Sequence, residues 1–334
     1  MKFFTKTMTT VLVVFSVSSF TVAQDAPKLN WKIGGTVQAM ASIAQTGADT
    51  SQTGFGLRRL RLKTYFNYDK VTAFVQLEGT TPKLLDARMT YKLSDAVNIR
   101  VGRFIGAGAR GGGLTSHTDI DIVERAMSAQ KWGSKTIGAD YRDYGASIFG
   151  KFGEFNYNVT AHNGNGAQNV KPSQQSQAKL LNGSSAFSGM VFYKSKEIKG
   201  LEAGGYYGIG NETFNDYNAY NAYVYWEPKP IRIKAEIIGV SDKNGVTDIN
   251  SLGYYVFGAY GFMDNWEALA RFENYDGNTD VDKNAETLIT IGARYALYPE
   301  KVSASKITFA YVIHSEEGDE IDNNVFYVMF QTAF

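Results

Sequence analysis

The sequence predicts an all-β protein, specifically a transmembrane antiparallel β-barrel of about 16 strands. Apolar and polar residues alternate with a period of two along most of the chain. The connections between these segments alternate between short and long. The composition, finally, combines 21 Tyr and 21 Phe with a formal net charge of only +1 in 334 residues, and it contains no cysteine. Disulfide scaffolds and general nucleic-acid binders are therefore not expected.

Residues 1–23 read as a secretory signal peptide. Lys2 and Lys6 form a basic start, residues 11–15 form a short apolar core, and residues 21–23 offer small side chains for cleavage. A buried N-terminal strand or helix is the alternative. The remainder, 24–334, contains no run of 18 apolar residues, so we expect an exported chain without a transmembrane helix.

Period-2 alternation defines the strands. Leu60, Leu62 and Phe66 share one face of a strand, whereas Arg59 and Lys63 share the other. The expected strands span 30–45, 56–68, 71–81, 85–93, 97–105, 140–152, 155–163, 185–195, 200–210, 218–227, 230–240, 251–262, 266–276, 286–297, 302–314 and 324–334. The aromatic residues are expected to sort onto the lipid-facing side, toward the strand ends.

The connections predict which end of the barrel faces which compartment. Those expected to be short are 69–70, 94–96, 153–154, 197–199, 228–229, 263–265 and 298–301. Those expected to be long are 46–55, 106–139, 164–184, 211–217, 241–250, 277–285 and 315–323, and 82–84 is short where a long one is due. Short periplasmic turns and long extracellular loops are typical of outer-membrane barrels. A secreted β-sandwich or β-propeller is the alternative.

The last segment places aromatic residues on one face. Phe326, Phe330 and Phe334 share a parity with Val328 and Thr332. This pattern is similar to the signal that the barrel assembly machinery reads, which makes that machinery an expected partner through Phe334. A final core strand is the simpler alternative.

Two stretches carry a family resemblance. The first comprises 58–63 (RRLRLK), 74–78 (FVQLE) and 85–88 (LDAR), and the second comprises 101–104 (VGRF), 114–116, 121–125 (DIVER) and 157–164. The chain resembles the phosphate-selective porin O and P family. The resemblance implies a homotrimeric porin in the outer membrane of a Gram-negative bacterium, with an external loop folded into an anion-favouring lumen. The Gly-rich stretch 106–113 differs from the family in holding a single basic residue, Arg110.

Charged side chains are expected to face the lumen, because a basic residue that faces lipid at mid-depth costs about 2–4 kcal/mol. The inward parity then carries about fourteen basic and about eight acidic residues. The candidate pore-lining basic residues are Arg59, Arg61, Lys63, Arg88, Lys92 and Arg100. Such a file of cations favours a passing anion. The alternative is a wall neutralised by ion pairs, for example Arg88 with Glu78 or Asp86.

Segment 106–139 is too long for a hairpin. Ile120, Ile122 and Val123 can pack it against the inner wall. The candidate residues of this constriction loop are Arg110, Asp119, Asp121, Glu124, Arg125 and Lys131. A surface loop is the alternative. Arg103 has the lipid-facing parity, although a bulge at Gly102 would turn it to this loop.

We therefore expect a porin for passive diffusion of small hydrophilic solutes, with a preference for anions such as phosphate. No catalytic motif, cofactor site or metal site is expected, since His117, His162 and His314 are widely separated. The expected partners are outer-membrane lipid, small anions and two further copies of the chain, without nucleic acid. The alternative function is a non-transport barrel, either a surface adhesin or structural protein, or a hydrolase.

Overall fold

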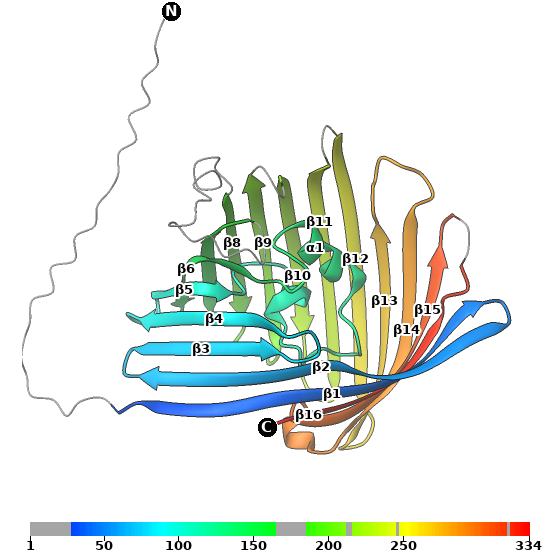
Figure 1. The fold of residues 1–334 in the computed structure, drawn as a ribbon, viewed down its shortest axis with the longest axis horizontal. Coiled ribbons are helices and arrows are strands. Elements are labelled where there is room, and N and C mark those ends of the chain that lie inside the picture. The colour runs from blue at the N-terminus through cyan, green and yellow to red at the C-terminus, as the bar shows by residue number, and fades with distance from the viewer. Residues whose placement is uncertain (1–27, 165–184, 212–215, 245–246, 319–320) are drawn as a thin grey trace, which may run out of the picture.

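The computed structural model describes residues 28–164, 185–211, 216–244, 247–318 and 321–334. Sixteen antiparallel strands form a closed barrel within this part of the chain (Figure 1). Each strand pairs with its neighbours in sequence, and the first strand closes the barrel against the last. The predicted fold class is therefore confirmed. The predicted signal peptide, residues 1–23, lies outside the described residues.

The strands cover most of the described chain. They are β1 (Asn30–Gly47), β2 (Thr50–Tyr68), β3 (Val71–Glu78), β4 (Lys83–Lys92), β5 (Asn98–Phe104), β6 (Asp143–Phe152), β7 (Phe155–His162), β8 (Ser185–Lys194), β9 (Leu201–Asn211), β10 (Tyr217–Trp226), β11 (Ile231–Asn244), β12 (Thr247–Gly261), β13 (Trp266–Asp276), β14 (Ala285–Ala296), β15 (Ser305–Glu316) and β16 (Val325–Ala333). A π-helical turn (Arg110–Leu114), the helix α1 (Met127–Lys135) and a 3-10 turn (Pro299–Lys301) complete the elements. No helix in the described residues is long and apolar enough to cross a membrane.

The outer surface of the barrel is apolar, as a lipid-facing surface requires. Phe152 and Phe187 are 63% and 53% exposed on this face. At the seam, the backbone of Phe334 exchanges two hydrogen bonds with Gly35, of 2.9 and 3.1 Å. Phe326 and Phe330 point outward from β16, so the aromatic parity of the last segment faces the lipid side.

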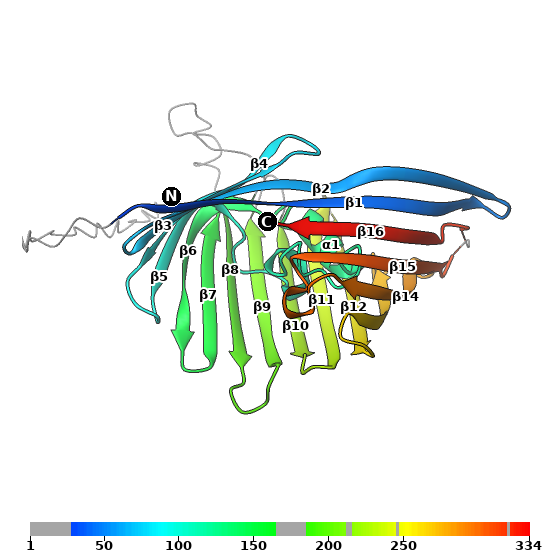
Figure 2. The same cartoon turned by 90° about the horizontal axis from the view of Figure 1, so that it is seen from below.

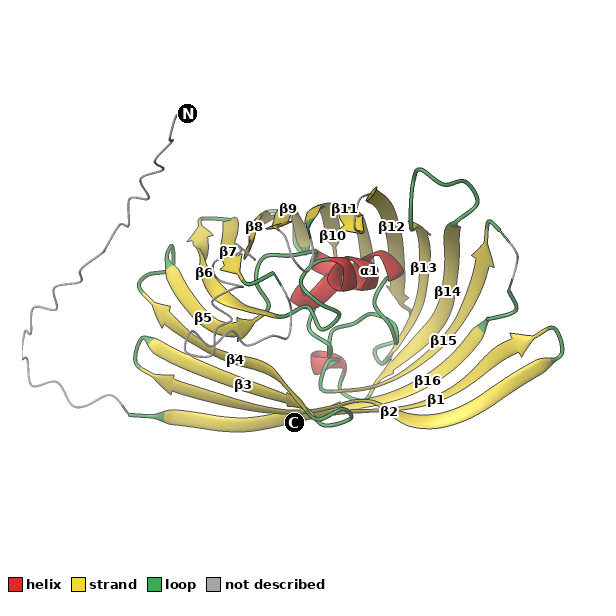
Figure 3. Cartoon of the chain, turned by 45° about the horizontal axis from the view of Figure 1, so that its top comes forward, coloured by secondary structure: helices red, strands yellow, loops and turns green. Residues whose placement is uncertain are grey.

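The expectation that aromatic residues sort onto the lipid-facing side holds for residues such as Tyr207, Tyr254 and Phe272, but it is wrong for part of the aromatic residues on β9, β10, β12 and β13. Seven aromatic residues on these strands are turned inward and buried: Tyr206, Tyr217, Tyr223, Tyr225, Tyr255, Phe257 and Tyr275. They pack against the segment between β5 and β6, which lies inside the ring of strands, where α1 sits next to β11, β12 and β13 (Figure 3). A second apolar core therefore exists within the barrel.

Two of the expected long loops, 46–55 and 241–250, are wrong. The β1–β2 ladder continues to the pair Gly47 and Thr50, and the β11–β12 ladder continues to Asn244 and Thr247. Backbone pairing does not need apolar side chains once a strand has left the bilayer, so these strand ends have the polar composition of a loop. Figure 2 shows the β1–β2 hairpin projecting beyond the neighbouring strand β16.

Candidate functional site

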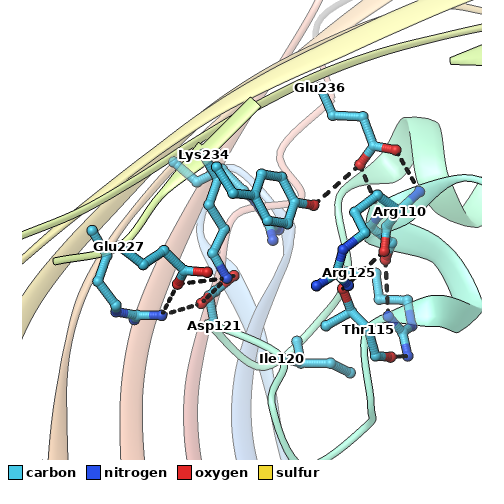
Figure 4. A network of polar contacts seen from close by, with 12 residues as sticks. Arg110, Thr115, Ile120, Asp121, Arg125, Glu227, Lys234 and Glu236 are labelled. Atoms are coloured by element: carbon cyan, nitrogen blue, oxygen red, sulfur yellow. Dashed lines mark hydrogen bonds and ion pairs between the residues drawn. The ribbon is translucent and has the colours of Figure 1, made fainter. Parts of the chain in front are cut away.

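The segment between β5 and β6 is held inside the barrel by buried carboxylates of the wall. Glu236 on β11 is 2% exposed and accepts hydrogen bonds from the backbone N–H groups of Arg110 (2.8 Å) and Gly111 (2.7 Å), as well as from the Tyr255 hydroxyl (2.9 Å) (Figure 4). A Cβ atom at position 111 would lie 2.6 Å from a Glu236 oxygen. Glycine at this position therefore allows the turn to approach the carboxylate.

Asp121 fixes the middle of the segment. Its carboxylate accepts hydrogen bonds from Arg232 (2.6 Å) and Lys234 (3.1 Å) on β11. Burial acts to raise the pKa of Asp121, but the charges of Lys234 and Arg232 hold it below its usual range. Asp121, a candidate residue of the predicted constriction loop, thus has its side chain turned to the wall and anchors the segment.

Two further residues of the wall, Glu273 and Lys306, also hold the segment. Glu273 on β13 accepts a hydrogen bond of 2.6 Å from the N–H of Met127, the first residue of α1, where the helix dipole favours negative charge. Lys306 on β15 donates to the carbonyls of Thr118 and Ile120, each at 2.9 Å. Because charged partners hold the segment along its length, its path across the lumen is well defined.

Apolar packing reinforces these contacts. Trp132 of α1 is 1% exposed, stacks on Tyr141 at 6.2 Å between ring centroids, and meets the edge of Tyr206 at 5.5 Å. Burying an aromatic side chain of this size contributes about 4–6 kcal/mol before conformational entropy is subtracted. The packed face of the segment is thus the one toward β8–β13.

A cavity of about 470 Å³ lies between the other face of the segment and the wall formed by β2, β3 and β4. Its eight basic lining residues are Arg58, Arg59, Arg61, Lys63, Lys83, Arg88, Arg125 and Arg142. Its four acidic lining residues are Glu78, Asp86, Glu124 and Asp140. The lining therefore carries an excess of four positive charges. We call this space the basic cavity.

Ion pairs neutralise only part of this lining. Arg61 pairs with Glu78 at 3.1 Å, Arg142 with Asp86 at 2.8 Å, and Arg58 with both oxygens of Glu124. Among the residues that the structure describes, Lys63, Arg88 and Arg125 have no carboxylate oxygen within 4.0 Å. Arg88 instead lies over the ring of Phe74, at 4.8 Å. Lys63 and Arg88 lie on the strand side of the cavity. Arg125 lies on the opposite side, where it donates to the backbone carbonyls of Gly111 (2.8 Å) and Thr115 (2.6 Å).

The pKa of His117 reflects the positive potential in the basic cavity. Its ring is 5% exposed, and Nε2 is 3.1 Å from the Thr36 hydroxyl. Burial lowers the pKa of His117, and the nearby charges of Arg61 and Lys63 lower it further. The imidazole is therefore neutral at physiological pH and does not add to the charge of the lining.

The predicted pore-lining residues fall into two groups. Arg59, Arg61, Lys63 and Arg88 line the basic cavity together. Lys92 lies apart at the end of β4, where it is exposed and pairs with Asp95 at 3.0 Å. Arg100 lies over the ring of Phe149 at 4.3 Å and bonds to Thr90.

The predicted loop residues also separate. Glu124 and Arg125 line the basic cavity. Arg110 points away from it and donates to Glu202 on β9 at 2.7 Å. Asp119 is exposed and lines a second cavity of about 400 Å³ beside β11, β14 and β15. Lys131 is exposed on α1, with Nζ 5.7 Å from the Tyr275 ring.

Sequence reasoning missed Arg58, Lys83 and Arg142 as lining residues. A bulge in the β1–β2 ladder, at the step from Gln38 to Ala39, leaves Arg58 without an opposite residue and lets it turn inward beside Arg59. Arg142 lies just outside β6 in a region without alternation. The inward orientation of Arg58 and Arg142 therefore cannot be predicted from the alternation of apolar and polar residues around them.

A second irregularity turns Arg103 inward. Gly102 has φ of +117°, and a Cβ atom there would lie 2.2 Å from the carbonyl oxygen of Ala87, so only glycine fits. Arg103 is consequently buried and donates to Asp140 (2.9 Å) and to the Leu84 carbonyl (2.9 Å). Arg103 thereby connects the end of the segment between β5 and β6, which we call the inner segment, to β4. In the described residues no group of three or more His, Asp or Glu side chains is placed to hold a metal ion.

These features define a class of protein: an outer-membrane β-barrel whose lumen is narrowed by an inward-folded segment. A family profile described as Gram-negative porin matches residues 9–312, and the chain belongs to this family. The protein is accordingly an outer-membrane channel for small solutes. A search among curated proteins finds no match to the sequence.

Solved porin structures share the fold at low sequence identity. An anion-selective porin from Comamonas acidovorans is 15% identical, with a TM-score of 0.69 over 92% of this chain and 100% of that chain. OmpF of Salmonella typhi is 13% identical, with a TM-score of 0.66 over 94% and 99%. The channel DcaP of Acinetobacter baumannii is 16% identical, with a TM-score of 0.63 over 92% and 97%.

Proposed function

We propose that this porin conducts small anions, phosphate among them, in preference to cations. The observation that carries the proposal is the basic cavity, with its excess of four positive charges. Three of its cations, Lys63, Arg88 and Arg125, lack a carboxylate partner among the residues that the structure describes. Charged groups that line a water-filled passage lower the energy of a counter-ion and repel ions of their own sign. The similarity to a structure described as an anion-selective porin supports the same sign of selectivity.

The chemistry of the lining suits oxyanions. Arg59 and Arg88 present guanidinium groups, whose planar N–H donors match phosphate and carboxylate oxygens better than an ammonium does. The cations of β2 and β4 lie along one wall and Arg125 lies on the opposite side, so an anion can pass from one cation to the next without being held by any single group. The resemblance to the phosphate-selective porin O and P family supports phosphate as one such solute.

The remaining predictions belong to the same proposal. Residues 106–139 act as the constriction loop of a barrel formed by 24–334, after a signal peptide at 1–23 is removed. Phe334 marks the last strand for the assembly machinery, and three copies associate. A structural neighbour, OmpT of Vibrio cholerae, is described in a trimer form, which supports the last point.

The experiment is a planar-bilayer recording on purified protein. Under a tenfold KCl gradient we expect a reversal potential of the sign given by chloride flux. Vesicles that contain the protein should also admit phosphate. A reversal potential of the opposite sign would overturn the anion preference, and absence of conductance would favour the alternative of a non-transport barrel.

A further inference from the structure

A separate cavity of about 530 Å³ lies on the opposite side of the turn Arg110–Leu114 from the basic cavity. It is formed by β5–β9 near the short turns that join β4 to β5, β6 to β7 and β8 to β9. Its apolar floor consists of Phe149, Met190 and Phe192, together with Leu114 from the inner segment. The lumen side of a porin wall is ordinarily polar. This apolar surface inside the barrel is therefore complementary to a ligand with an apolar part.

Cations surround this floor. Four of them line the cavity, namely Lys92, Arg110, Lys151 and Lys194, against two carboxylates, Asp95 and Glu202. The ammonium of Lys194 lies 5.4 Å from the ring of Phe192. The cavity thus combines aromatic rings with positive charge a few ångströms away.

The two carboxylates do not neutralise the four cations. Glu202 receives both Arg110 (2.7 Å) and Lys194 (3.1 Å). Asp95 receives both Lys92 (3.0 Å) and Lys151 (3.9 Å). Because each carboxylate is shared by two cations, the cavity keeps an excess of two positive charges, and the exposed Lys151 and Lys194 can turn to an incoming anion.

We propose that this cavity is a binding site for aromatic carboxylates, at which the ring packs on Phe149 and Phe192 while the carboxylate meets Lys151 and Lys194. The inference rests on the proposed anion preference and names a substrate class within it. A cavity of this size lies in the range that holds small organic ligands. A purely inorganic anion would use the cations but gain nothing from the apolar floor.

The test measures block of the chloride current by 2-naphthoate added to the periplasmic side at neutral pH, with acetate and octanoate as reference anions. We expect 2-naphthoate to block at the lowest concentration and acetate to block least. Phe149→Ser and Phe192→Ser should each raise the concentration for half-block about fivefold, since an aromatic contact is lost. The double variant Lys151→Gln, Lys194→Gln should raise it as well.

Phe74→Ser is the matched control, because it removes an inward phenyl that also lies under a cation, but in the basic cavity. Its half-blocking concentration of 2-naphthoate should equal that of the parent. Equal block by octanoate, or equal sensitivity of all three Phe variants, would overturn the assignment. The reversal potential in the same membranes separates the two proposals: chloride preference without dependence on Phe149 and Phe192 contradicts this site alone, whereas cation preference contradicts the proposed function.

Discussion

Replacing Arg59, Arg61 and Lys63 with Gln removes three of the eight positive charges that line the basic cavity. These residues occupy successive inward positions on β2, so the three glutamines keep the polar inner face and the alternation of the strand. Removal of Arg61 takes away the partner that Glu78 has at 3.1 Å, and the unpaired negative charge of Glu78 adds to the loss of positive potential. We expect a folded channel with a clearly reduced preference for anions.

The size of the effect follows from charge and distance. A unit charge about 8 Å from a monovalent ion in water contributes about 0.5 kcal/mol, and screening over a Debye length of about 8 Å reduces this to about 0.2 kcal/mol. Three charges then change the energy of an anion by about 0.6 kcal/mol and that of a cation by the same amount in the opposite sense. The ratio of anion to cation permeability should therefore fall about sevenfold.

The assay is the reversal potential of the triple variant in a KCl gradient, compared with the parent. A control with equal net charge replaces Lys196, Lys199 and Lys229, which are exposed in periplasmic turns, with Gln. The control should keep the parent's permeability ratio. An unchanged ratio in the triple variant, or an equal loss in the control, would show that the basic cavity does not set the selectivity.

Three further predictions concern the inner segment. Glu236→Ala leaves two backbone N–H groups without an acceptor, at about 1–3 kcal/mol each, and should increase current noise in single-channel recordings; a quiet channel would contradict this anchor. The pKa of Asp121 is held below its usual range, so its anchoring is fully present above about pH 4 and is lost as the pH falls further. Current noise should rise only in that acidic range, whereas Asp121→Asn should be noisy at pH 7. The pKa of His117 is lowered, so the reversal potential should be equal at pH 5 and pH 8, and a difference that His117→Gln abolishes would refute the neutral imidazole.

The barrel itself was predictable, because every membrane strand must present one side chain to lipid and the next to water. This requirement produces the period of two in the sequence, and it also predicts that Arg59, Arg61 and Lys63 lie on one inward face. Arg88 reached the same cavity from β4 by the same rule. On a regular strand whose inward face carries charged side chains, parity is sufficient to assign a face.

The rest depends on contacts between distant parts of the chain. The inward orientation of Arg58 results from a bulge in the β1–β2 ladder. The register between two strands cannot be predicted from the sequence of either strand alone. Glu236 meets the turn at Gly111 over a separation of 125 residues. Tyr206 on β9 contacts Trp132 only because α1 packs against this wall. Polar strand ends outside the bilayer, finally, lose the alternation that identifies strands.

If the proposed function is correct, ions pass along the wall of β2–β4 beside the segment between β5 and β6. The chain contains no cysteine, so a single Lys63→Cys variant can be labelled at one known position. We predict that a positively charged thiosulfonate reagent restores the anion preference of this variant, whereas a negatively charged one lowers it further, as read from the reversal potential. If mass spectrometry shows complete labelling and neither reagent changes the reversal potential, the ion passage does not run past Lys63, which contradicts the proposed role of the basic cavity.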